Sequence, residues 1–391
     1  MARRLQRGQA VEVDPVVGDV ESGGVETGLA ELGEVLGRVA PVLVFFIAIT
    51  IVAEVADAAG VFDVAGHWTA RAARHRTPLL WLLFVALAVG CTVFLSLDTT
   101  AVLLTPVGLA IASQLRVSAV PFALTTLWLA NTASLLLPVS NLTNLLALHH
   151  FEALGLGHRG YLRLAAAPAT AAVVGTAAVL YLLHRRELGG RFSAEAPSGP
   201  HDRLMLRIAG AVCLGVCPLF AVGLPPAWVA SVAAGLLVVA LLVRSPTTLR
   251  HLSVPWAMAL GVAVLFVAVD LALRHGLQPA LSTLAGEGTS AASLAQVAAT
   301  GALAANVVNN LPAYAALESV TAHDPARLMA LLVGVNVAPL VSPWASLATL
   351  LWAQRCRARG IRLPAKSLAL QGLACAAVST GLALGALLLV R

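Results

Sequence analysis

Polar side chains gather at four short breaks within otherwise apolar sequence. The first half carries them at 98–100 and 131–144, and the second half at 306–310 and 336–346. Asparagine, serine, threonine and aspartate can donate and accept hydrogen bonds within a small space. Helices broken inside a bilayer persist only where they line a cavity, because the freed backbone groups need partners. The pattern predicts a solute or ion site near the middle of a membrane.

We expect this site to be lined by residues of both halves, namely Asp98, Thr99, Thr100, Asn131, Thr132, Ser140, Asn141, Thr143, Asn144, Asn306, Asn309, Asn310, Asn336, Ser342 and Ser346. None of them is Arg or Lys. A multiply charged anion would therefore depend on helix N-termini or on cations bound with it. A neutral solute with several hydroxyl groups, or a small cation, suits the lining better. For the Asn and Thr residues, local capping of broken helix ends is an alternative role.

Coupling of transport to a gradient requires a group that can take up a proton. The candidates within apolar sequence are Asp98, Asp270 and Glu54, with Asp57 close to Glu54. Ionisable side chains at this depth are costly and usually functional, and burial disfavours the charged form of a carboxyl group. Asp98 ranks first because it stands at a break. Capping or interfacial anchoring is the alternative role for each of them.

The composition defines the class of protein. Among 391 residues, 59% are hydrophobic and only 11% are charged, with a mean hydropathy of +0.87. A soluble chain carries about twice that charged fraction, so we predict an all-α polytopic membrane protein. The formal charge of +6 reflects arginines at span ends and predicts no nucleic-acid partner. The five cysteines lack metal-site spacing, and we expect neither a metal nor a cofactor.

Apolar segments with charged flanks suggest how the chain crosses the bilayer. We expect re-entrant hairpins at 78–114 and 289–320, with tips at 97–100 and 306–310, and broken membrane-spanning helices at 119–150 and 326–352. This path places most Lys and Arg residues on one side, which is then the cytoplasm. The N-terminus would lie outside.

The two halves correspond in order. Asn131, Pro138 and Asn144 match Asn336, Pro343 and Thr349 at one constant spacing, and the hairpins enter the membrane from opposite sides. Such halves are inverted repeats. The predicted units are a polar, disordered tail at 1–37, a first repeat at 38–184, a cytoplasmic linker at 185–203 and a second repeat at 204–391.

These motifs resemble the arsenical pump membrane proteins, which are arsenite permeases of the ion transporter superfamily. The matching stretches are 97–106, 131–135 with 139–142, 308–312 and 346–352. The resemblance implies a multi-pass protein of the plasma membrane with paired hairpins and broken helices. It also implies efflux of As(III) and Sb(III) coupled to protons, and As(OH)3 is a solute of the expected kind. Family members have two more helices before the segment matching 39–60, where this chain has a polar tail.

The sequence thus predicts a secondary active transporter that exports arsenite or antimonite in exchange for protons. A sodium-coupled anion symporter and a sodium/proton antiporter are the alternatives within the superfamily. A separate ATPase subunit is a partner to consider, because no phosphate-binding glycine loop is present. A homodimer is a second partner to consider. An enzyme acting through intramembrane carboxylates or through His149 and His150 is disfavoured, since no catalytic constellation accompanies them.

Overall fold

A computed structural model describes residues 47–192, 202–221, 224–246, 252 and 256–391, with scattered positions between 33 and 45. Nearly all of the predicted tail at 1–37, and much of the linker at 185–203, lie outside the described residues. Within them the long apolar segments are helical, because a helix satisfies every backbone hydrogen bond internally in lipid. The prediction of an all-α polytopic membrane protein is confirmed.

Six described helices are long and apolar enough to cross a membrane. They are α3 (Thr77–Leu95), α4 (Leu97–Gln114), α7 (Gly157–Leu188), α9 (Pro226–Arg244), α13 (Ala291–Val308) and α17 (Ala365–Val390). The bent pair formed by α11 (Trp256–Ala272) and α12 (Gln278–Ala285), joined by a π-helical turn at Leu273–Leu277, is a seventh candidate. Because α7 continues to Leu188, the predicted linker begins inside this helix.

Each hairpin turns at one residue with a positive φ angle. Helix α3 gives way to α4 at Ser96, where φ is 113°, and α13 gives way to α14 (Asn310–Thr321) at Asn309, where φ is 94°. The first turn therefore lies just before the predicted tip at 97–100, whose residues form the first turn of α4. Non-glycine residues rarely adopt such angles. Both side chains accept a hydrogen bond from the following helix, at Thr99 N and Leu311 N.

The other two polar stretches interrupt helices as well. Helix α5 (Ala119–Thr132) is followed by short 3-10 turns at Ala133–Leu135 and Pro138–Ser140, and then by α6 (Leu142–Ala153). In the second half, α15 (Pro325–Val337) is separated from α16 (Leu347–Ala358) by irregular backbone. The side chains of Asn141 and Ser346 cap the helices that follow. The helices thus break inside the polar stretches that the sequence indicated.

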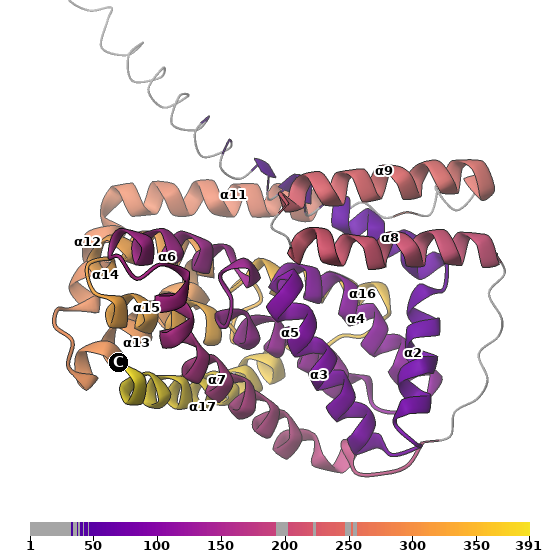
Figure 1. Ribbon diagram of the computed structural model, residues 1–391, viewed down its shortest axis with the longest axis horizontal. Helices are drawn as coiled ribbons and strands as arrows, with labels where there is room; N and C mark the ends of the chain where they lie inside the picture. The colour runs from indigo at the N-terminus through magenta and orange to yellow at the C-terminus, as the bar shows by residue number, and fades with distance from the viewer. Residues whose placement is uncertain are drawn as a thin grey trace, which may run out of the picture.

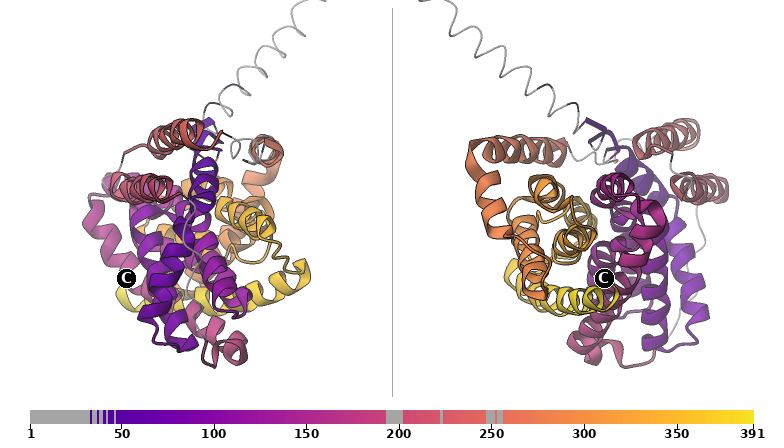
Figure 2. Two further views of the ribbon diagram at one scale, coloured as in Figure 1. Left: turned by 90° about the vertical axis from the view of Figure 1, so that its right-hand side faces the viewer. Right: turned by 60° about the vertical axis from the view of Figure 1, so that its left-hand side comes forward.

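Helices α7 and α17 lie side by side along much of their length (Figures 1 and 2). The backbone of α17 comes very close to the second break, because a Cβ atom on Gly372 would lie 1.9 Å from the carbonyl oxygen of Leu340. Helices α8 (Arg203–Ala221) and α9 form a pair beside α2 (Val61–Ala72) and α3 (Figure 1). Arg244 at the end of this pair contacts Asp202 at 2.8 Å.

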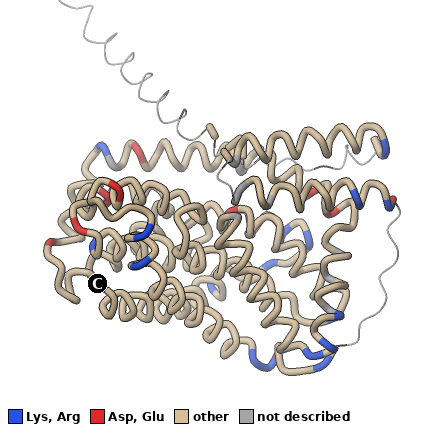
Figure 3. The backbone as a smooth tube through the Cα atoms, viewed as in Figure 1, with Lys and Arg blue, Asp and Glu red and all other residues tan. Residues whose placement is uncertain are grey.

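Basic residues concentrate toward one end of the long axis (Figure 3). There the connection between α2 and α3 meets the end of α7, where Thr77 N donates to Gly190 O and Phe192 N donates to His75 O. At the other end, Arg327 donates to the carbonyl oxygens of Gly286 and Gly288, both at 2.6 Å.

Candidate functional site

Four helices begin at one small cavity of about 50 Å³. Helices α4, α6, α14 and α16 each place their first residues in its wall, and Phe266 of α11 completes it. The lining comprises Leu97, Asp98, Asn141, Leu142, Phe266, Asn309, Asn310, Leu311 and Leu347. A water needs roughly 10–15 Å³ measured in this way, so the cavity accommodates a solute of a few heavy atoms.

The electrostatics of this cavity are set by helix ends and one carboxyl group. Each helix N-terminus acts as roughly half a positive charge, and α4, α6, α14 and α16 all direct this end toward the cavity. Asp98 is the only ionisable residue among the described residues that line the cavity. The helix ends favour an electron-rich ligand, while the aspartate supplies a hydrogen-bond acceptor.

The carboxyl group of Asp98 is incompletely satisfied. Its Oδ1 atom is buried and has no hydrogen-bond partner among the described residues. Asp98 occupies the first turn of α4, where the helix dipole stabilises a negative charge. A buried acceptor without a partner is costly, so this atom is available to a proton or to a donor on a bound solute.

A buried amide network joins the two halves beside the cavity. Asn336 of α15 accepts hydrogen bonds at Oδ1 from Asn141 Nδ2 at 3.0 Å and from Thr143 Oγ1 at 2.8 Å. Its Nδ2 donates to Asn144 Oδ1 at 2.7 Å. The amide of Asn144 in turn donates to the carbonyl oxygens of Ser134 and Leu137. Predicted site residues from both repeats therefore meet. The side chains of Thr143 and Asn144 bind Asn336, and none of these three residues lines the cavity.

The second hairpin is fastened to the second break by its own asparagines. Asn306 donates to Ala338 O at 2.9 Å and accepts from Val341 N and Ser342 N. Asn309 Nδ2 donates to Trp344 O at 2.8 Å, and Asn310 N donates to Ala345 O at 2.9 Å. Asn306 thus binds the backbone of the second break without lining the cavity. Asn309 and Asn310 also bind this backbone, and they line the cavity as well.

Hydroxyl groups fasten the first hairpin in the same way. Thr100 Oγ1 donates to Ser96 O at 2.9 Å, and Thr99 Oγ1 accepts from Ser96 Oγ at 3.0 Å. Ser140 Oγ reaches from the first break to Val93 O of α3 at 2.7 Å. These contacts hold the tip of the first hairpin in place. Thr99, Thr100 and Ser140 do not line the cavity.

Four further predicted residues also lie outside the wall. Asn131 Nδ2 and Thr132 Oγ1 donate to backbone oxygens one turn earlier in α5, and Asn131 Oδ1 is buried without a partner among the described residues. Ser346 caps α16 through Thr349 N. The buried Oγ of Ser342 has no partner in the described part of the chain.

The other carboxyl groups proposed for coupling are paired at a distance from the cavity wall. Glu54 contacts Arg355 of α16 at 2.8 Å, and the arginine side chain is only 4% exposed. Asp57 contacts Arg359 one turn further along. Asp270 contacts Arg274 at 2.7 Å near the end of α11. Of the coupling candidates, Asp98 alone lines the cavity.

Sequence reasoning overlooked the apolar part of the wall. Leu97, Leu142, Leu311 and Leu347 each follow directly after a serine or asparagine at the start of a helix. Ser96, Asn141 and Ser346 cap their helices, whereas α14 is capped by Asn309, one residue before Asn310. Serine or asparagine also precedes leucine elsewhere in the sequence, as at 134–135 and 367–368, so this pair alone does not locate the four helix starts.

Paired hairpins, broken helices and a small cavity at which four helices begin are the features of a multi-pass membrane transporter. The described residues contain no group of three metal-ligating side chains. The chain belongs to the citrate transporter family, whose pattern matches residues 24–353. It is also similar to proteins named "Arsenical pump membrane protein".

The arsenical pump membrane protein of Escherichia coli (strain K12) is 28% identical over 333 residues, which cover 78% of this chain and 76% of the relative. The Shigella flexneri protein of the same name gives the same values. That of Yersinia enterocolitica is 27% identical over the same shares. The resemblance stated from the motifs is confirmed, as is a multi-pass protein of the plasma membrane.

Proposed function

We propose that this protein exports arsenite or antimonite from the cell in exchange for protons. The observation that carries the proposal is that Asp98, whose buried Oδ1 has no partner among the described residues, lines a small cavity at which four helices begin. As(OH)3 presents electron-rich oxygens to the helix ends and hydroxyl donors to the carboxylate. The names of the relatives supply the substrate class.

Exchange follows if proton and solute compete for the same atom. With Asp98 ionised, Oδ1 accepts a hydroxyl hydrogen of the solute. With Asp98 protonated, that acceptor is lost and the solute is released. One charge moved across 100 mV provides about 2.3 kcal/mol, which supports roughly a fifty-fold gradient of a neutral solute per proton.

The membrane side that releases the solute follows from the charge distribution. The arginine-rich end of the molecule (Figure 3) would face the cytoplasm under the positive-inside rule. Solute would then enter the cavity from that end, and protons from the other. A homodimer and a separate ATPase subunit are further proposals, and they concern the partners of this protein.

A sodium-coupled anion symporter is the second candidate. The family description names a citrate transporter, and a carboxylate such as that of Asp98 is also a ligand for a small cation. The cavity of about 50 Å³ is small for a tricarboxylate, which favours the inorganic solute.

Transport by purified protein in lipid vesicles tests the proposal. We expect arsenite flux driven by a pH gradient and independent of sodium, lost at least a hundred-fold in Asp98→Asn. Asp270→Asn is the matched control, because this carboxyl is paired with Arg274 outside the cavity wall, and it should retain most of the flux. Proton-driven flux that survives in Asp98→Asn would contradict the assignment of this residue. Flux of carboxylates that requires sodium would instead establish the second candidate.

A further inference from the structure

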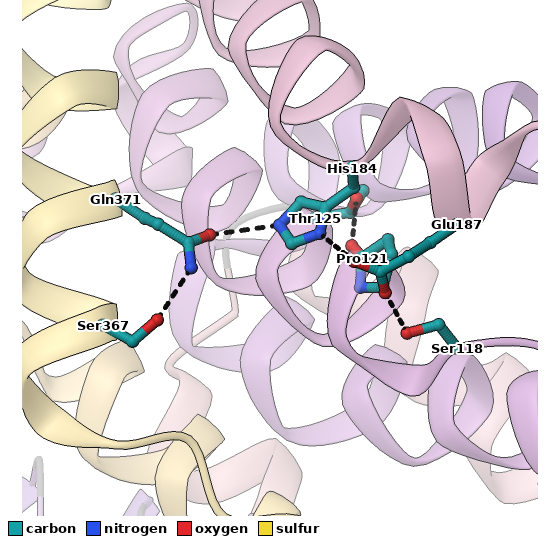
Figure 4. Close-up of polar contacts among 7 residues, drawn as sticks. All are labelled: Ser118, Pro121, Thr125, His184, Glu187, Ser367 and Gln371. Carbon is teal, nitrogen blue, oxygen red and sulfur yellow. Dashed lines mark hydrogen bonds and ion pairs between the residues drawn. The ribbon is translucent and has the colours of Figure 1, made fainter.

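A second ionisable cluster lies where α7, α17 and the connection between α4 and α5 meet (Figure 4). His184 is 6% exposed in its side chain and stands between Glu187 of its own helix and Gln371 of α17. The backbone of α7 departs from helical angles at His184, with φ of −112° and ψ of 15°. The transport mechanism above does not use this cluster.

Both ring nitrogens of His184 face oxygen atoms. Nδ1 is 2.9 Å from Glu187 Oε1, and Nε2 is 3.1 Å from Gln371 Oε1. The amide of Gln371 is oriented by its own donation from Nε2 to Ser367 Oγ at 2.9 Å. Ser118 contacts the second oxygen of Glu187 (Figure 4). With the Gln371 amide in this orientation, the two hydrogen bonds require a hydrogen on each ring nitrogen, which only the imidazolium form has.

We propose that His184 is a proton-binding site, separate from Asp98, whose occupation fastens α7 to α17. A neutral ring has one nitrogen without hydrogen, and that nitrogen would face an oxygen lone pair. Loss of the proton therefore either opens one contact or turns the amide of Gln371. Histidine is the side chain whose charge changes most readily between pH 5 and 8.

The charged neighbours of His184 act in both directions, because Glu187 favours a proton on the ring and the nearby basic residues oppose it. Glu187 supplies the negative charge, and its side chain is 40% exposed, so it gives the cluster access to solvent. Close to the cluster along the chain are Arg185 and Arg186 of α7, Lys366 at the start of α17 and Arg116 before α5. Helices α3 and α5, which also contact α7, carry no Asp, Glu, Lys, Arg or His. The remaining charged groups stand at the other end of α7, namely His158, Arg159 and Arg163 of α7 itself, His149, His150 and Glu152 of α6, and Arg327 of α15.

The position of the cluster connects it to the second break. Gly372 follows Gln371, and a Cβ atom built on it would lie 1.9 Å from the carbonyl oxygen of Leu340. Further along the same pair of helices, Thr176 Oγ1 and Ser379 Oγ are 2.9 Å apart. A proton on His184 would therefore tighten the helix that supports the break at 338–346.

Nuclear magnetic resonance of ¹⁵N-histidine protein in lipid vesicles, without substrate, tests the proposal between pH 5 and 9. Comparison with His184→Gln assigns the signal. We expect His184 to show the imidazolium form at the acidic end and to lose it at higher pH.

Thermal unfolding provides the second measurement and uses variants that keep the cluster nearly isosteric. The difference between the unfolding midpoints at pH 6 and pH 8 should be a few degrees smaller in Glu187→Gln than in the unaltered protein. His158→Gln is the control, because His158 is exposed at the other end of α7. A ring that stays neutral throughout the range, or a pH dependence unchanged in Glu187→Gln, would overturn the proposal. Neither measurement depends on which solute the protein carries.

Discussion

The amide groups of Asn336 and Asn144 face each other across the boundary between the two halves of the chain, with Nδ2 of Asn336 donating to Oδ1 of Asn144 at 2.7 Å. The two residues are 192 positions apart in the sequence and both are fully buried. Asn336 also accepts from Asn141, which lines the cavity. This contact fixes the start of α6 relative to the second repeat.

Asn336→Ala should destabilise the protein by about 3 kcal/mol. It removes the partners of Asn141, Thr143 and Asn144, and each buried polar group left unsatisfied costs roughly 1–3 kcal/mol. Asn131→Ala is the control, since Asn131 occupies the corresponding position but has one backbone contact and an oxygen without a described partner. Reversible unfolding in detergent measures both. Equal losses in the two variants would show that the network between the halves contributes nothing.

The ion pair between Glu54 and Arg355 should couple the first described helical segment to α16. In Glu54→Gln the arginine keeps its charge while buried at 4% exposure, and removal of one partner of a buried pair costs about 3 kcal/mol or more. Arg355→Gln alone should cost less, because Glu54 is 20% exposed. A double-mutant cycle on unfolding free energies measures the coupling. A coupling energy indistinguishable from zero would contradict this.

Gly372→Ala should prevent α17 from packing against the second break. The new Cβ atom would lie 1.9 Å from Leu340 O and 2.8 Å from its carbonyl carbon, and backbone atoms cannot move aside easily. Gly385→Ala is the matched control on the same helix, because no atom lies within 4 Å of the Cβ atom built there. Expression of folded protein in the membrane, followed by thermal unfolding, compares them. Normal folding of Gly372→Ala would mean that the two segments separate readily.

Several expectations came from residues that are close together in the sequence. A polar residue at the start of an apolar helix is recognisable as a cap, and Ser96, Asn141, Asn309 and Ser346 all accept a hydrogen bond from the helix that follows. Local physics of this kind predicts where helices break. It does not separate a capping side chain from one that lines a cavity.

The carboxyl groups illustrate what local reasoning lacks. Asp98, Glu54 and Asp270 all stand in apolar sequence and carry the same chemistry. Glu54 is paired with a residue 301 positions away, and Asp270 with one four positions away. The Oδ1 atom of Asp98 finds no partner in the described part of the chain. Partners of a buried charge depend on which helices become neighbours.

The sequence by itself determined the class of protein, the helices, their breaks and the family. These follow from apolar length, from capping residues and from motifs, all of which are written along the chain. Only the tertiary structure decided that α4, α6, α14 and α16 begin at one cavity, and that Asn336 joins the halves. The physical reason is that hydrogen bonding inside lipid constrains each helix alone, whereas side-chain packing between helices decides which polar ends meet.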